Sequence, residues 1–146
     1  MYKTSTGIAS YGRVANTETN PLKQIVMLYD GAIKFLNLSA SDIEAGDFAA
    51  KGDHTNRALD IVSYLQSILD LENGGDVAVS LDNLYRSVRI LIMRASAVPD
   101  AGLMRRAAEI LMPMRDAWET NAQTIQTAPT FNMPPAPEHS AFAVVG

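Results

Sequence analysis

The sequence predicts an all-α protein, an elongated antiparallel four-helix bundle, and three observations carry that prediction. First, apolar residues recur at helical spacing in four separate stretches. Second, short segments with Gly, Asn, Asp or Pro separate these stretches, and connections this short join antiparallel neighbours. Third, no segment alternates apolar and polar residues over the length of a strand, so we expect no sheet. A chain of 146 residues fits one domain with terminal extensions.

The first predicted helix organises the rest of the chain. It begins at Pro21, directly after the good N-cap residue Asn20, and we expect it to end near Gly46. Its apolar residues follow two lines: Leu22, Ile25, Val26, Tyr29, Ile33 and Leu36 on one, and Leu28, Phe35 and Leu38 on the other. A helix covered on one side needs only one such line. The helix is therefore either the centre of its domain or offers a second face to a partner.

Three further helices follow. Asp47 is the expected N-cap of the second, whose apolar stripe stops at residues 73–75, Asn-Gly-Gly. Asp76 is the expected N-cap of the third, and Pro99-Asp100 breaks the chain and starts the fourth. Pro113 falls inside the fourth helix and predicts a kink, because it removes one backbone hydrogen bond. The first two helices would have roughly 26 residues and a length of about 39 Å each, which makes a long, narrow bundle.

The bundle, residues 20–126, lies between two segments of different composition. Residues 1–19 form a polar N-terminal arm that we expect to be flexible, with Ile8 and Tyr11 among its few apolar residues. Such an arm can dock in a groove of its own domain or of a partner. Residues 127–146 form a Pro-rich tail that we expect to be disordered.

Composition argues against several classes of function. The formal net charge is −4 and there is no basic block, so we expect no nucleic-acid binding. There is no cysteine, and neither histidine follows a Glu at the spacing of a di-iron site, so we expect no metal or other cofactor. No apolar run is long enough to cross a bilayer, so we expect no membrane insertion. The N-terminus lacks the apolar core of a signal peptide, which fits a cytoplasmic protein.

One chemical alternative remains. His54, on the second helix, is followed one turn later by Arg57, roughly the arrangement of a histidine phosphotransfer bundle, in which a basic neighbour steadies the phosphate. The segment around His54 is polar and weakly helical, which favours a solvated side chain instead. We therefore weigh phosphotransfer through His54 as the alternative to a binding function, and otherwise expect no enzyme.

A set of short motifs occurs in a recognisable order along the chain. They are Met1-Tyr2, Gly7-Ile8 and Tyr11 near the start, Asn20-Pro21 and MLYDGAIKFL in the first helix, then Glu44-Ala45-Gly46-Asp47, LDLENGGDVAVSLDNLY from Leu69 to Tyr85, and Asp116-Ala117-Trp118. Each motif is weak evidence singly, but their order and spacing extend over roughly Met1 to Thr120. Together they resemble the flagellar secretion chaperones that are specific for flagellin, the FliS family.

The resemblance implies a cytoplasmic helical bundle that binds the disordered C-terminal segment of flagellin. It implies that this binding blocks premature filament polymerisation and delivers flagellin to the export gate of the flagellar type III apparatus. The arm with Ile8 and Tyr11 corresponds to a segment linked in the family to docking and export. The chain departs from the family pattern at three places: Arg86 follows Tyr85, Pro113 interrupts the fourth helix, and the tail extends past the usual end.

Surplus apolar surface and the resemblance lead to one hypothesis of partner binding. We expect a groove for the unfolded partner, hereafter the client, with these anchors: Leu28, Phe35, Leu38, Ile90 and Met93. We further expect Ile8 and Tyr11 to cover part of this groove until the client expels the arm and exposes it to the export gate. A purely structural bundle that self-associates through the same surface is the third possibility.

Overall fold

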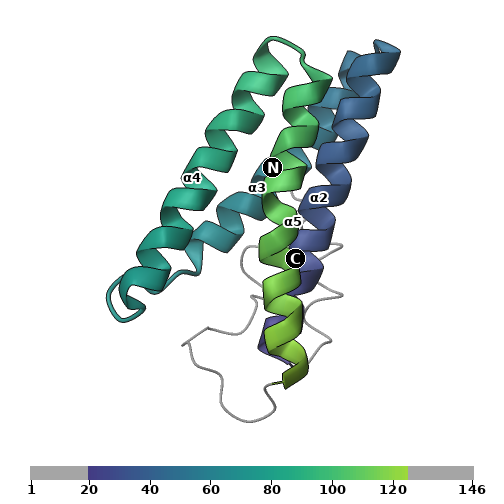
Figure 1. The fold of residues 1–146 in the computed structure, drawn as a ribbon. Coiled ribbons are helices and arrows are strands. Elements are labelled where there is room, and N and C mark those ends of the chain that lie inside the picture. Colours follow the sequence, from purple (N-terminus) through teal and green to yellow (C-terminus); the bar gives the residue numbers. More distant parts are fainter. Residues whose placement is uncertain (1–19, 125–146) are drawn as a thin grey trace.

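The computed structural model describes residues 20–124, which form four α-helices in a bundle (Figure 1). The helices are α2 (Pro21–Ala45), α3 (Phe48–Ser67), α4 (Gly75–Ala97) and α5 (Ala101–Thr124). No strand occurs within residues 20–124. The predicted all-α four-helix bundle is therefore confirmed. The predictions for the arm, residues 1–19, and for the tail, residues 127–146, lie outside the described residues.

Local sequence determines both ends of α2. The side-chain oxygen of Asn20 accepts a hydrogen bond from the Leu22 N–H at 2.9 Å, which satisfies one of the free donors of the first turn. At the other end Gly46 adopts a φ of +74°, a left-handed conformation that costs glycine little. This conformation lets the Asp47 N–H reach the Asp42 carbonyl at 2.9 Å, so the last carbonyls of the helix are satisfied. Both predicted ends are confirmed.

The second helix ends earlier than the sequence predicts. Asp47 does cap α3, because its carboxylate accepts from the Ala50 N–H at 3.1 Å, but α3 stops at Ser67. The Ser67 hydroxyl donates to the Tyr64 carbonyl at 2.7 Å, a local bond that competes with helix continuation. The chain from residue 68 to residue 74 is then a connection, in which Asp70 accepts from the Asn73 N–H. The predicted length of roughly 26 residues was wrong for α3, which has 20.

The predictions for the last two helices need one correction. The N-cap of α4 is Gly74 and not Asp76, which lies in the first turn. A carboxylate there still interacts favourably with the helix dipole. Asp100 precedes α5 as expected and accepts from the Leu103 N–H at 3.0 Å. Helix α5 is continuous through Pro113, so the proline does not end it, and the kink stays a prediction.

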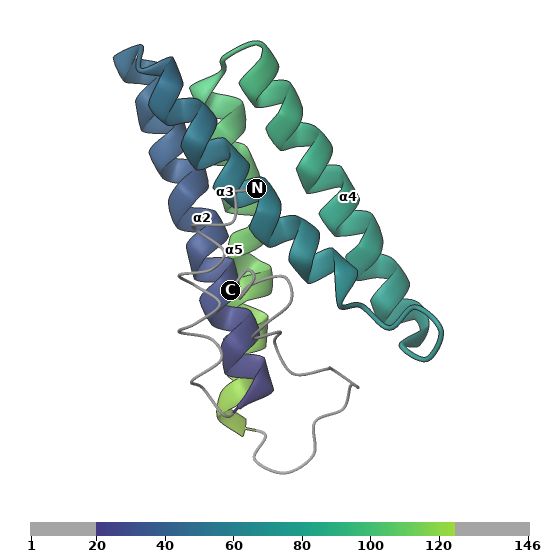
Figure 2. The same cartoon turned by 180° about the vertical axis from the view of Figure 1, so that it is seen from behind.

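The four helices pack as a ring in chain order. Helix α2 contacts α3 and α5, α4 also contacts α3 and α5, and neither diagonal pair is in backbone contact. Helices α2 and α5 run side by side, whereas α3 crosses from the end of α2 to the start of α4 (Figure 2). The largest fully buried side chains include Tyr29, Tyr85, Leu36, Ile61, Leu65, Ile92, Met104 and Leu111. Most of both apolar lines of α2 face this core, so α2 is mainly a central helix.

Polar contacts join α2 to α5 along their whole length. Near the middle, Arg115 Nε lies 2.8 Å from Asp30 Oδ1, and at one end two nitrogens of Arg105 lie 2.7 and 2.8 Å from the Glu44 carboxylate. At the other end, the Asn20 amide donates to the Ala122 carbonyl at 3.1 Å. The α3–α4 connection diverges from this second end of the α2–α5 pair (Figures 1 and 2). The four helices thus lie together at the end that contains Glu44 and Arg105. At the end that contains Asn20, the α3–α4 connection diverges from α2 and α5, and we call this the open end of the bundle.

Candidate functional site

A cavity of about 510 Å³ lies at the open end of the bundle, between the α3–α4 connection and the α2–α5 pair. Most of its lining is apolar: Ile25, Leu65, Ile68, Leu69, Val77, Ala78, Leu81, Tyr85 and Trp118. Asp70, Asn73 and Asn121 add polar groups. Cavities of this size and character bind small molecules or the side chains of a partner. We refer to it below as the pocket.

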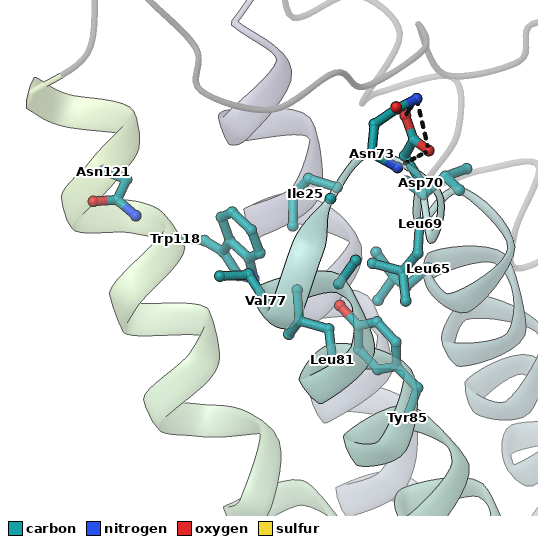
Figure 3. Close-up of a pocket in the computed structure, with 13 residues that line it drawn as sticks. Ile25, Leu65, Leu69, Asp70, Asn73, Val77, Leu81, Tyr85, Trp118 and Asn121 are labelled. Atoms are coloured by element: carbon teal, nitrogen blue, oxygen red, sulfur yellow. Dashed lines mark hydrogen bonds between the residues drawn. The ribbon is translucent and has the colours of Figure 1, made fainter.

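All four helices and the α3–α4 connection contribute residues to the pocket. Figure 3 shows Trp118 projecting from α5 towards Val77 and Leu81 on the first turns of α4. Leu81 is buried, whereas Val77 is 63% exposed and forms part of the rim. Because α3 ends at Ser67, the connection that follows it places Leu69 on the opposite wall. The early end of α3 therefore contributes directly to the pocket.

Tyr85, which lines the pocket, forms a buried pair with Tyr29 of α2. The hydroxyls of Tyr29 and Tyr85 lie 2.7 Å apart, and their rings are tilted with centroids 6.3 Å apart. Burial raises the pKa of Tyr29, although hydrogen bonds to Tyr85 and Trp118 oppose this shift. The pKa of Tyr85 is also raised, first by burial and then by its neighbour Tyr29. Both hydroxyls therefore stay neutral at physiological pH.

The chemistry of the pocket is that of binding. Among the described residues that line the pocket, Asp70 is the one carboxylate, and it accepts from the Asn73 N–H at 3.0 Å. Among residues 20–124, no group of His, Asp or Glu is arranged to hold a metal ion. Within the same residues, no helix is both long and apolar enough to cross a membrane. The arrangement can desolvate apolar side chains of a partner, for which no catalytic group is needed.

The structure separates the five anchors that the sequence analysis placed in one groove. Leu28 and Phe35 are buried in the core, so their expected place on a free surface was wrong. The physical reason is the path of α3, which covers this side of α2: the Phe35 ring stacks on His54 of α3 at 5.9 Å between centroids.

The other three anchors are exposed but do not share one face. Leu38 is 37% exposed on α2, whereas Ile90 and Met93 are 51% and 47% exposed on α4. Because α2 and α4 lie across the ring from each other, these three residues do not form a continuous groove within the described residues. Ile8 and Tyr11 lie outside the residues that the structure describes.

Sequence reasoning missed the pocket because it assigned several pocket residues to the packed stripes of their helices. Val77, Leu81 and Trp118 do fall at core spacing, and nothing in that spacing shows that the helices diverge there. The available signal was the connection itself, where apolar Ile68 and Leu69 occur just before several turn-forming residues. Where the end of a helix diverges from the bundle, no neighbouring helix covers the apolar residues at that end.

His54 is part of a structural contact between α2 and α3. Its Nδ1 lies 2.6 Å from Asp42 Oδ2, and one face of its ring stacks on Phe35. The neighbouring cation, Arg57, lies over the same Phe35 ring and forms an ion pair with Asp53 at 3.2 Å. Both side chains thus have partners that explain their positions, and the geometry gives no specific support to phosphotransfer.

Comparison with known proteins identifies the family of this chain. The model of the family described as "Flagellar protein FliS" matches residues 5–125. A flagellar secretion chaperone FliS of Vibrio cholerae is 34% identical over 100 residues, which cover 68% of this chain and 74% of the relative. The FliS of Salmonella typhimurium is 32% identical over 124 residues, or 82% of this chain and 91% of the relative. The FliS of Bacillus subtilis is 29% identical over 111 residues, with 75% and 80% covered. These names are those of chaperones and not of enzymes, and the extent of the family match shows that the chain belongs to the FliS family.

Proposed function

We propose that this chain is a flagellar secretion chaperone whose client is the C-terminal segment of flagellin. In the cytoplasm it would hold this segment, prevent premature polymerisation and deliver flagellin to the export gate of the flagellar type III apparatus. The observation that carries the proposal is the apolar pocket at the open end of the bundle, which can cover apolar side chains of a partner. The names of the relatives, flagellar secretion chaperones, support the same function.

Tight binding of an unfolded client requires more than one apolar contact with the chaperone. An unfolded client loses conformational entropy when it becomes ordered, so a large apolar area must be buried to obtain a tight complex. At about 25 cal/mol per Å², 100 Å² of buried apolar surface contributes about 2.5 kcal/mol before that cost. The pocket supplies one anchor point, where the exposed rim residue Val77 and the indole of Trp118 can be covered by client side chains.

The exposed apolar residues of the outer surfaces supply further contacts in this proposal. Ile90 and Met93 lie one turn apart on α4, and Leu38 lies on α2. A client that folds in pieces can contact separate faces of the bundle without one continuous groove. In the absence of a client, the same apolar residues would favour self-association.

The arm supplies the contact with the export machinery in this proposal. Ile8 and Tyr11 are spaced apolar residues in a polar segment, which is the pattern of a short docking motif. Deletion of residues 2–14 also tests whether the arm covers the client surface in the free chaperone. A tighter complex with a flagellin peptide after deletion supports such a cover, and an unchanged or weaker complex argues against it.

Co-purification with flagellin tests the function most simply. The chain is expressed together with the flagellin of the same organism, and the complex is isolated and digested with a protease. The proposal predicts that flagellin is retained and that its C-terminal segment is protected. Failure to retain flagellin, or protection of another segment alone, would contradict it.

A further inference from the structure

We propose that the Pro-rich stretch at the start of the tail, residues 125–137, docks in the pocket when no client is bound. The proposal concerns the chain alone and therefore goes beyond the proposed function. The pocket lies beside the end of α5, where the tail begins. Trp118 and Asn121, one turn apart on α5, line the pocket (Figure 3), and the helix continues to Thr124. The tail thus begins about 4.5 Å along the helix axis from the last pocket residue of α5.

The start of the tail is long enough to return to the pocket. Trp118 lies six residues before Thr124, or about 9 Å along the helix axis. Phe131 follows Thr124 by seven residues, which span up to about 23 Å when extended, so enough chain remains for a turn. A tether this short gives a local concentration in the millimolar range. A contact whose dissociation constant is about 1 mM for the separate peptide is therefore largely formed within the chain.

The composition of this stretch matches the lining of the pocket. Residues 125–137 contain no Asp, Glu, Lys, Arg or His, so their burial takes no charge out of water. Phe131 and Met133 supply two large apolar side chains within this uncharged stretch. The pocket, at about 510 Å³ and with mostly apolar lining residues, has the size and character of a site that holds such groups.

Prolines favour docking for two further reasons. Four of them occur in residues 125–137, at positions 129, 134, 135 and 137, and Pro134 and Pro137 have the spacing of a PxxP segment. Such segments adopt the extended PPII conformation and bind against aromatic side chains, which Trp118 provides on the α5 wall of the pocket. Proline also restricts the free chain, so less conformational entropy is lost when the stretch becomes ordered.

The arm is the other segment of this chain that starts at the open end, because the Asn20 amide donates to the Ala122 carbonyl at 3.1 Å. Residues 1–19 contain no proline, and Gly7 and Gly12 increase the entropy lost on ordering. The arm is therefore the less favoured occupant. The family match ends at residue 125, so the docking of the tail would be a property of this chain beyond the part that matches the family.

Quenching of Trp118 fluorescence by acrylamide tests the docked state without flagellin. Trp118 is the single tryptophan of the chain, so the signal reports on the pocket. The full chain is used throughout. The test variant is Phe131→Ser with Met133→Ser, and the control, Phe142→Ser with Val144→Ser, removes two apolar side chains from the tail outside the Pro-rich stretch. All four substitutions lie outside the helices, so circular dichroism should show the wild-type helix content in both variants.

We expect the quenching constant of the test variant to exceed that of the wild-type chain by about twofold, and that of the control to stay unchanged. A peptide of residues 125–137, added to the test variant at several millimolar, should restore the protection, whereas the same peptide with both anchors replaced by Ser should not. Equal constants for the wild-type chain and the test variant, or an equal rise in the control, would overturn the inference. A rise in Ile8→Ser with Tyr11→Ser alone would overturn it in favour of the arm, and protection that depends on protein concentration would overturn it in favour of a second copy.

A client that enters the same pocket has to displace the tail. The test variant should therefore bind a flagellin C-terminal peptide about three- to tenfold more tightly than the wild-type chain does. Equal affinities would show that the client and the tail do not share the pocket and would overturn their competition. A flagellin peptide that binds neither chain contradicts the proposed function, whereas the quenching result needs no flagellin and is unaffected.

Discussion

The Tyr29 and Tyr85 hydroxyls, 56 positions apart in the chain, meet at 2.7 Å in the centre of the bundle. They connect α2 with α4, two helices that lie across the ring and have no backbone contact. Tyr85 also lines the pocket, as does Trp118 of α5, whose indole partly offsets the rise that burial causes in the pKa of Tyr29. The bond between the two hydroxyls therefore joins the α4 wall of the pocket to α2.

The tyrosine pair predicts a cost for the removal of either hydroxyl. Tyr29→Phe and Tyr85→Phe each leave the other buried hydroxyl without this partner. A buried polar group without a partner costs about 1–3 kcal/mol, so each variant should lower the free energy of unfolding by about that amount. Urea denaturation of both variants measures the loss.

The double variant provides the control for the tyrosine pair. Once one hydroxyl is gone, removal of the second no longer breaks the bond between them, so the two losses should not add. The loss in Tyr29→Phe with Tyr85→Phe should be smaller than the sum of the single losses by about 1 kcal/mol. Additive losses would show that the two hydroxyls do not interact in solution.

Two glycines predict opposite effects of the same substitution. Gly46 has a φ of +74°, so Gly46→Ala forces a side chain into the left-handed region and should cost about 1–2 kcal/mol of unfolding free energy. Gly52 lies inside α3 with open space around its Cα, so Gly52→Ala should stabilise the bundle by about 1 kcal/mol. Thermal unfolding of the two variants checks both signs. A loss of stability in Gly52→Ala would contradict the helical assignment of this weak segment.

Asp60 predicts an unusual dependence of stability on pH. Burial raises the pKa of this half-buried carboxyl to about 6, from 3.8, and its Oδ2 has no hydrogen-bond partner in the described residues. Between these two pKa values the folded state binds more protons than the unfolded state, so this group's contribution to stability falls as pH rises from about 4 to about 6. The full shift would correspond to about 3 kcal/mol, and solvent screening of the exposed half reduces this to about 1 kcal/mol.

Asp60→Asn isolates that contribution. The variant should be more stable than the wild-type chain at pH 7 by about 1 kcal/mol and should lose this advantage at pH 4. Urea denaturation at pH 4, 5, 6 and 7 measures the difference, in which the titration of all other carboxylates cancels. An advantage that does not change between pH 4 and pH 7 would contradict a raised pKa.

The exposed residues Ile90 and Met93 on α4 predict that the chain self-associates in the absence of a client. Ile90→Ser with Met93→Ser removes two half-exposed apolar side chains, which should change stability by no more than about 0.5 kcal/mol at each site. Light scattering should show a lower average mass for this variant than for the wild-type chain at high concentration. Leu71→Ser, at an exposed apolar residue in the α3–α4 connection, is the control. A wild-type chain that remains monomeric would argue against self-association through this face.

Helix ends could be predicted from the sequence because the interactions that make them are local. Asn20, Gly46, Asp47 and Asp100 each act on residues within one turn, and all four perform the expected role. The end of α3 was predicted wrongly because its decisive contact, a side-chain bond from Ser67 to its own helix, competes with a pattern that continues.

The site could be predicted only in part, because burial of a given face depends on where the next helix crosses. Leu28 and Phe35 have the spacing of a spare face, but both are buried, and His54 of α3 stacks on Phe35. Conversely, Val77 and Trp118 have the spacing of a core and yet line a cavity, because α4 begins away from α2 and α5. The spacing of apolar residues predicts which face of its helix a residue lies on. Whether that face is buried depends on how the neighbouring helices pack.

The central claim is that the client occupies the pocket, and two neighbouring valines on α4 test it. Val77 is 63% exposed and lines the pocket, whereas Val79 is 50% exposed and does not. Serine at either position removes the same apolar groups from an exposed site on the same helix. Binding of a flagellin C-terminal peptide can be followed by the fluorescence of Trp118, the single tryptophan of the chain. Our account predicts that Val77→Ser weakens the complex by about five- to tenfold and that Val79→Ser leaves it within about twofold of the wild-type chain. Equal affinities of the two variants would contradict it.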